Sequence, residues 1–157
     1  MSKYYITKVG YQQLYEDCLS IDNEITEANK MMGESVKRDN DLRENPEFME
    51  LRVKAMYELP AKKQTLWDKY RSAIIIEESE EYLQFDGKTV IRGSKVKLDF
   101  DGDDICEYQI KGTDEGDLKN DILSCDAPMA QALLGKQLGT VVVFNGMSIE
   151  ILEIERL

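Results

Sequence analysis

Apolar and small residues recur along the first part of the chain with the spacing of a long helical seam. They follow one another at alternating intervals of three and four positions, at Tyr11, Leu14, Cys18, Ile21, Ile25, Ala28, Met32 and Ser35. This is the heptad spacing of a helix that packs along a partner helix. The residues between them are largely charged, as on a solvated exterior. The pattern predicts one helix over residues 8–36, about 43 Å long.

A second helical pattern predicts the partner of the first helix. Residues 39–41 favour a turn, so the first helix should end near Arg38. Asn45 followed by Pro46 is typical of a helix start, because Asn caps a helix and Pro suits its first turn. The second helix should reach Ile76, with one apolar face that comprises Phe48, Leu51, Ala55, Leu59, Leu66, Tyr70 and Ile74. Pro60 predicts a bend near residues 56–60, and the short turn makes the two helices antiparallel.

Short strands replace helices beyond an acidic run at residues 77–81, which we interpret as a linker. Strand patterns cover residues 89–100, 106–111 and 122–123, and a short helix follows from Asp126 to Gly135. Asn145-Gly146 between two apolar runs predicts a hairpin. The apolar frame slips near Leu152, which predicts a bulge. The fold class is therefore α+β, with an antiparallel α-helical coiled-coil hairpin over residues 1–78 and an antiparallel β-sheet domain with a short helix over residues 79–157.

Composition and charge exclude several classes of function. The formal net charge is −11, which argues against independent nucleic-acid binding because phosphates would be repelled. The chain has no histidine, which excludes Ser-His-Asp and Cys-His catalysis and His-ligated zinc. Three cysteines without paired spacing, and no apolar segment after the first residues, predict a cytoplasmic protein without a membrane association.

Asp41 and Glu44 carry the candidate chemistry, because they stand three positions apart between the two helices. One interpretation is a capping box, with Asp41 as the N-cap and Glu44 at the third helical position. The other is a cation site, but two carboxylates are too few for Mg²⁺, which prefers six oxygen ligands, so another molecule would have to share the ion. Basic residues flank this pair at Lys37, Arg38, Arg43 and Arg52. They form either part of a solvated face of mixed charge or a basic stripe that contacts phosphates.

Two stretches of this sequence resemble signatures of the bacterial GreA/GreB transcript cleavage factors. Residues 40–48 read Asn-Asp-Leu-Arg-Glu-Asn-Pro-Glu-Phe, which is similar to Gly-Asp-Leu-Lys-Glu-Asn-Ala-Glu-Tyr in that family. Residues 114–124 and 127–136, followed by the valine-rich hairpin, resemble the second family signature in the same order. The resemblance covers essentially the whole chain.

The resemblance implies a coiled coil that enters the secondary channel of RNA polymerase and an FKBP-like domain that docks on the channel rim. Asp41 and Glu44 would then help to place a Mg²⁺ shared with the polymerase, which cleaves backtracked RNA; the chain would not be an enzyme on its own. The turn that carries Asp41 and Glu44 would be the tip of the coiled coil. Four basic residues would support this tip or the RNA 3′ end, namely Lys37, Arg38, Arg43 and Arg52. Docking would involve Asp126, Pro128 and Met129. The alternative is a paralogue that occupies the same channel and regulates without cleavage, against which the retained acidic pair argues.

Overall fold

The computed structural model describes residues 3–38, 41 and 44–157, which form two compact units. One unit is Gln12–Ser72, and the other combines Met1–Tyr11 with Ala73–Leu157. We expected the division to fall between residues 78 and 79. The partition falls between Ser72 and Ala73 instead, and the start of the chain belongs to the same unit as its C-terminal part. No described helix is long and apolar enough to cross a lipid bilayer.

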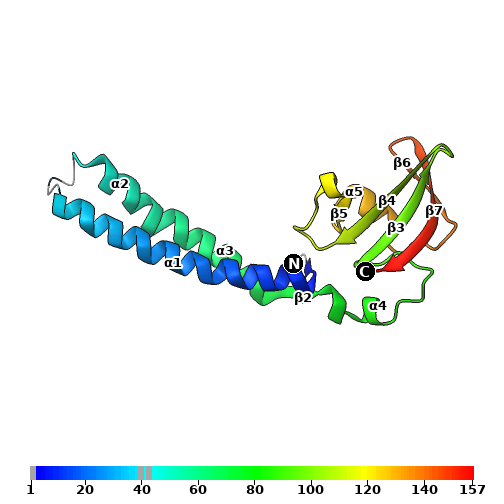
Figure 1. Cartoon of the computed structure of the whole chain (residues 1–157), viewed down its shortest axis with the longest axis horizontal. Helices are drawn as coiled ribbons and strands as arrows, with labels where there is room; N and C mark the ends of the chain where they lie inside the picture. Colours follow the sequence, from blue (N-terminus) through cyan, green and yellow to red (C-terminus); the bar gives the residue numbers. More distant parts are fainter. Residues whose placement is uncertain (1–2, 39–40, 42–43) are drawn as a thin grey trace. The chain divides into compact units, whose positions relative to one another are not determined.

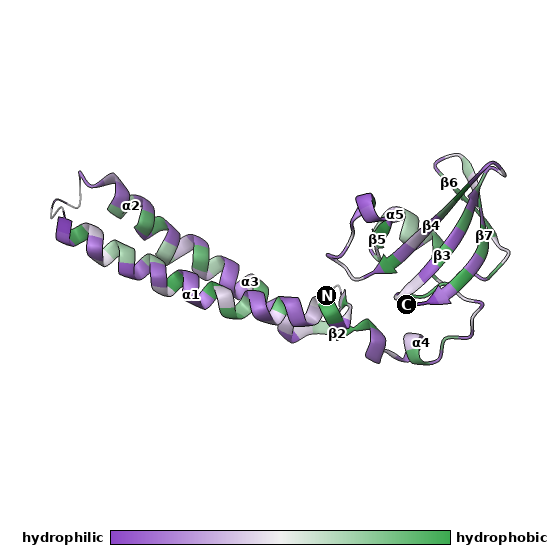
Figure 2. Cartoon of the chain, in the orientation of Figure 1, coloured by the Kyte–Doolittle hydropathy of each residue, from purple (hydrophilic) through white to green (hydrophobic). Residues whose placement is uncertain are grey.

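The helical unit is an antiparallel hairpin, as the heptad spacing and the short turn together predict (Figure 1). Its first helix is α1 (Lys8–Arg38), which begins in the other unit, and its second arm comprises α2 (Pro46–Val53), the π-helical turn η1 (Lys54–Glu58) and α3 (Leu59–Ser72). Ile21 and Ala28 from α1 pack with Ala55 and Leu59 from the second arm. None of the predicted seam positions of α1 is exposed, and apolar segments alternate with hydrophilic ones along both arms (Figure 2).

The irregularity that Pro60 predicts takes the form of a π-helical turn. In η1 the backbone N–H of Leu59 donates to the carbonyl of Lys54, five residues earlier, instead of four. A proline ring clashes with the carbonyl four residues before it and has no N–H to donate. A wider turn directly before Pro60 lets the helix continue without that clash, so the second arm remains helical on both sides.

The second arm ends earlier than the sequence analysis predicts. We expected the helix to reach Ile76, but α3 ends at Ser72 and Ala73–Ile75 forms strand β2. This strand pairs in parallel with β1 (Tyr4–Ile6), with Tyr5 opposite Ile74. The β-branched run from Ile74 to Ile76 favours extended backbone, and pairing with β1 satisfies its backbone groups. The apolar periodicity therefore continued past the true end of the helix.

A curled mixed sheet of five strands forms the body of the other unit within the described residues (Figure 1). The strand order is β5-β4-β3-β7-β6. The strands are β3 (Ser94–Phe100), β4 (Asp104–Lys111), β5 (Ile122–Ser124), β6 (Val141–Phe144) and β7 (Met147–Arg156). The expected sheet is antiparallel, whereas β5 joins β4 in parallel and makes the sheet mixed. The first predicted strand is also shorter than expected, since it begins at Ser94 and not at residue 89.

Short helices surround this sheet and complete its core. They are the 3₁₀ turns η2 (Ile76–Glu78) and η3 (Leu118–Asn120) and the short helices α4 (Glu80–Leu83) and α5 (Pro128–Leu133). Ala130 and Leu133 of α5 are buried with Val96, Leu98 and Ile151 of the sheet. This apolar layer holds α5 in place, and Pro128 begins the helix as predicted.

The hairpin and the bulge predicted near the end of the chain are both present. Asn145 and Gly146 form the two-residue turn between β6 and β7 with positive φ angles of 51° and 78°. The pairing of β3 with β7 shifts between Lys97 and Leu98, where Leu152 is the additional residue of β7. The bulge keeps Ile151 and Ile154 both buried despite their odd spacing.

Candidate functional site

Asn45 organises the turn at which the two arms of the helical hairpin meet. It is 5% exposed and is the N-cap of α2, where its side-chain oxygen accepts from the backbone N–H of Phe48 at 3.0 Å. Its Nδ2 donates to Ser35 Oγ at 2.9 Å and to the Ser35 carbonyl at 3.3 Å. One buried amide therefore starts the second arm and binds it to the last turns of the first arm.

Glu47 adds a second polar link between the same two helices. Its carboxylate accepts from Arg38 Nη2 at 2.8 and 2.9 Å and from Ser35 Oγ at 3.2 Å. Glu47 lies in the first turn of α2, where the helix dipole favours a negative charge, and Arg38 closes the C-terminal end of α1. Sequence analysis did not find this network, although a seam serine at position 35 is a signal that polar contacts replace apolar packing there.

Asp41 and Glu44 lie in the turn before this network, and the side chains of both are exposed. The backbone N–H of Glu44 donates to the carbonyl of Asp41 at 3.1 Å, so the two residues share one turn. The capping-box interpretation of this pair is wrong, because Asn45 and not Asp41 caps α2. Pro46 explains the difference, since its fixed φ and missing N–H suit the first helical position. The pair is therefore exposed and is not the cap of the second arm.

The other residues predicted at the tip occupy different environments. Lys37 and Arg52 are exposed on the ends of α1 and α2. Arg38 is paired with Glu47, so it supports the turn directly. Arg43 lies outside the described residues. The structure thus exposes Lys37 beside the turn and Arg52 about two helical turns further along the second arm, and it uses Arg38 to join the two arms.

The residues expected to dock on a partner lie around the start of α5, in the C-terminal unit. Asp126 and Pro128 are exposed, and the backbone N–H of Asp126 donates to Ser124 Oγ at 3.2 Å. Met129 is partly buried and packs against the core of the sheet. Asp126 and Pro128 are accessible to another molecule, whereas much of Met129 serves the fold.

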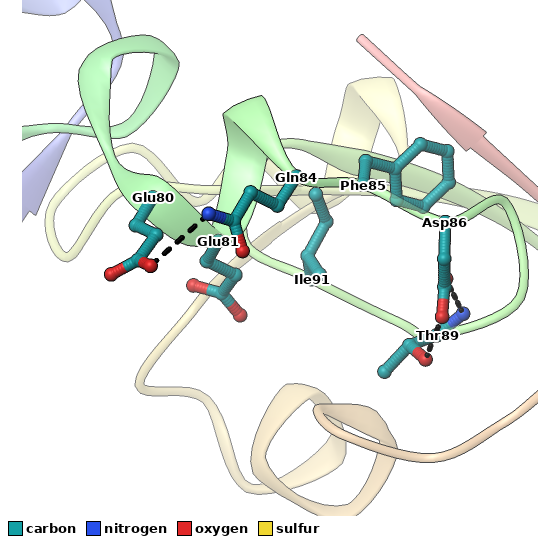
Figure 3. A pocket seen from close by; sticks show the side chains of 7 residues that line it. All are labelled: Glu80, Glu81, Gln84, Phe85, Asp86, Thr89 and Ile91. Carbon is teal, nitrogen blue, oxygen red and sulfur yellow. Dashed lines mark hydrogen bonds between the residues drawn. The ribbon is translucent and has the colours of Figure 1, made fainter.

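A surface pocket of about 380 Å³ in the C-terminal unit was not predicted from the sequence. Figure 3 shows that its lining comes from α4 and the following loop, and it comprises Glu80, Glu81, Gln84, Phe85, Asp86, Thr89 and Ile91. Backbone hydrogen bonding from Lys88, together with hydrogen bonds from Thr89, holds the pKa of Asp86 below its ordinary value. Glu81 pairs with Arg92 at 3.2 Å. Glu80 accepts a hydrogen bond from Gln84 Nε2 at 3.1 Å, so all three carboxylates of the pocket are already engaged by the protein itself.

Comparison with known proteins places the chain in a family. A family model described as "Transcription elongation factor, GreA/GreB, C-term" matches residues 86–156. Transcription elongation factor GreA of Clostridium botulinum (strain Alaska E43 / Type E3) is 34% identical over 158 residues, which cover 93% of this chain and 96% of that protein. GreA of Clostridioides difficile (strain 630) is 33% identical over 162 residues, with 98% and 97% covered.

A solved structure also matches along nearly the whole length. The GreA factor homolog 1 (Gfh1) protein of Thermus thermophilus is 21% identical and has a TM-score of 0.43, with 98% of this chain and 99% of that chain covered. The family assignment rests on the sequence matches. The α+β fold with an N-terminal helical hairpin agrees with the expectation from the two signatures, although the sheet is mixed and not antiparallel. The chain belongs to the GreA/GreB family of transcription elongation factors.

Replacement of Asn45 by Ala should destabilise the helical unit by about 2 kcal/mol, because it removes an N-cap and leaves Ser35 without its buried partner. Urea unfolding followed by the fluorescence of Trp67, the single tryptophan, measures this change in α3. Asn29→Ala is the matched control, since Asn29 is exposed within α1. Equal stability of the two variants would contradict the role given to Asn45.

Proposed function

We propose that this chain stimulates cleavage of backtracked nascent RNA by RNA polymerase, with the helical hairpin inserted into the secondary channel of the polymerase. The observation that carries the proposal is the exposed pair Asp41 and Glu44 at the end of a long two-helix arm. Asn45 and Glu47 stabilise the turn behind the pair, so the arm can present two carboxylates to another molecule. Membership of the GreA/GreB family supports the same function.

The residues at the tip fit a shared Mg²⁺, because carboxylate oxygens are the ligands this ion prefers. Asp41 and Glu44 would each offer oxygen ligands, and the polymerase and the RNA would supply the remaining positions. When bound, the ion supplies Lewis-acid activation of water and stabilisation of charge on phosphate. The two carboxylates would also orient a water molecule by accepting its hydrogen bonds. The chain itself would thus contribute ligands, while the catalytic centre belongs to the polymerase.

The remaining predicted site residues have supporting parts in this proposal. Lys37 is exposed beside the turn and Arg52 is exposed in the last turn of α2, and both would contact phosphates of the RNA near its 3′ end. Such contacts position the RNA without reading its sequence. Asp126 and Pro128 are exposed in the C-terminal unit and would contact the rim of the channel. The net charge of −11 makes contact with RNA dependent on the polymerase, which brings the two together.

A cleavage assay on backtracked elongation complexes tests the proposal. With 5′-labelled RNA, Mg²⁺ and purified polymerase, the chain should shorten the transcript faster than the polymerase does alone. Binding to polymerase without faster cleavage would overturn the proposal in favour of a regulator that occupies the channel. Failure to bind polymerase would overturn it in favour of a coiled-coil scaffold.

A further inference from the structure

The second arm of the hairpin carries an additional apolar face that points away from α1. We call it the outer stripe, and it comprises Met49, Val53, Met56 and Tyr57, whose exposed fractions are 44%, 45%, 53% and 61%. Their spacing of four, three and one positions places them along one side of the helix. These apolar residues lie outside the heptad spacing, which selects only the face of the second arm that packs on α1.

The outer stripe is distinct from the face that holds the hairpin together. Phe48, Leu51 and Ala55 are less exposed than the stripe, and Ala55 packs with Ile21 and Ala28 of α1. The helix around α2 and η1 is therefore apolar on two sides. A helix with a second apolar face normally buries that face as well. Part of this helix lacks its covering surface in the isolated chain.

The next segment of the same arm shows a different exterior. In α3, a fully described helix, no large apolar side chain belongs to the exposed set, and its outward positions include Lys62, Gln64 and Asp68. The change from an apolar to a polar exterior follows η1 directly. Apolar exposure is thus concentrated in the part of the arm nearest the acidic turn.

The place of the outer stripe on the second arm, next to the acidic turn, indicates which molecule covers it. Met49 lies four positions beyond Asn45, so the stripe continues directly from the turn that carries Asp41 and Glu44. A partner that receives the turn must also surround the first turns of α2. We propose that the outer stripe contacts an apolar wall of the polymerase secondary channel; this inference rests on the proposed function.

Charge indicates that this contact is hydrophobic in nature. The exposed charged residues beside the stripe are of both signs, namely Glu50, Arg52, Lys54 and Glu58. Their sum is neutral, so they give little net attraction to a channel of either sign. Apolar burial would supply the affinity, and two of the four stripe residues are methionines, which adapt to irregular apolar surfaces. The contribution of the stripe should therefore change little with salt concentration.

The test replaces all four stripe residues by Gln, which forms helices about as well as Met. In the backtracked-complex assay, Met49→Gln/Val53→Gln/Met56→Gln/Tyr57→Gln should raise the factor concentration for half-maximal cleavage by at least about 30-fold. The rate at saturating factor should stay near the wild-type rate, because Asp41 and Glu44 are unchanged. The increase should be the same at low and high salt.

A matched pair of single variants controls for the loss of any exposed apolar side chain. Val53 and Leu19 are both 45% exposed and both lie on helices of the hairpin. Val53→Gln should raise the half-maximal concentration about 3-fold, whereas Leu19→Gln should not change it. Equal effects of the two single variants would overturn the assignment of the stripe.

Two other results would also overturn the inference. One is a quadruple variant with the wild-type half-maximal concentration. The other is a wild-type dimer that becomes a monomer in the quadruple variant, measured by light scattering at assay concentration, because a second copy would then cover the stripe. If wild-type chain fails to stimulate cleavage at all, the proposed function is wrong and the inference falls with it, so the two failures are distinguishable.

Discussion

Asp41→Asn combined with Glu44→Gln should reduce the stimulated rate of RNA cleavage by at least about 100-fold at saturating factor. The amides keep the shape of the side chains but remove two negative charges, and with them the ligands for a divalent cation. Because both side chains are exposed and Asn45 caps α2, the fold of the hairpin should not change. Rates of transcript shortening in stalled, backtracked complexes measure the effect.

A control with the same charge change separates chemistry from general electrostatics. Glu24 and Glu27 are exposed on α1 and also stand three positions apart. Glu24→Gln/Glu27→Gln should keep the wild-type cleavage rate, since these residues lie along the arm and not at its turn. If Asp41→Asn/Glu44→Gln also keeps the wild-type rate, the two carboxylates have no role in RNA cleavage.

Glu115→Ala should lower the free energy of unfolding of the C-terminal unit by about 3 kcal/mol, the largest stability effect we expect from a single polar residue. The Glu115 carboxylate accepts from Thr7 N at 2.9 Å, from Thr7 Oγ1 at 2.5 Å and from Gly112 N at 2.8 Å. Thr7 in turn caps α1, because its Oγ1 accepts from Gly10 N at 3.1 Å. Loss of the carboxylate leaves these donors without their partner.

Gly10 of α1 leaves room for the Glu115 carboxylate beside the helix. An added Cβ at Gly10 would lie 2.1 Å from Glu115 Oε1, so a larger residue at position 10 would displace the carboxylate from its hydrogen bonds. Thermal unfolding followed by circular dichroism should show a midpoint lowered by roughly 10 °C. Glu77→Ala is the control, since Glu77 accepts one exposed hydrogen bond from Lys8 N at 2.8 Å. A loss no greater than that of the control would contradict the account of Glu115.

The sequence predicted what depends on apolar spacing and on local cap and turn residues. The α1 seam, the start of the second arm at Asn45-Pro46, the Asn145-Gly146 hairpin and the bulge at Leu152 are all present. Each of these features is local, since residues within one continuous segment determine it. The disturbance at Pro60 also falls where it was expected, because the missing N–H acts within one helical turn.

Features that depend on distant parts of the chain were missed or wrong. The helix predicted to reach Ile76 ends at Ser72, because strand β1 from the start of the chain pairs with Ala73–Ile75. The parallel pairing of β5 with β4 likewise depends on a partner outside the local pattern. Sequence spacing gave no sign of the contact between Glu115 and Thr7, which lie 108 positions apart.

The sequence predicted the residues of the candidate site but not the contacts that hold the turn in place. Asp41 and Glu44 were found by their spacing and by resemblance to the family signature, and both are exposed in the turn. The capping interpretation failed because two residues, Asp41 and Asn45, were both good caps, and only the placement of Pro46 decides between them. The contacts of Ser35 and Glu47 required two helices to be placed side by side.

In the function proposed above, Asp41 and Glu44 help to hold a Mg²⁺ that the polymerase alone holds weakly. The most direct measurement is a Mg²⁺ titration of RNA cleavage in backtracked complexes, with wild-type chain, with Asp41→Asn/Glu44→Gln and without factor. The account predicts that wild-type chain lowers the Mg²⁺ concentration for half-maximal cleavage about 10-fold or more, while the variant leaves it at the value of polymerase alone. The same Mg²⁺ dependence in all three titrations would contradict the claim.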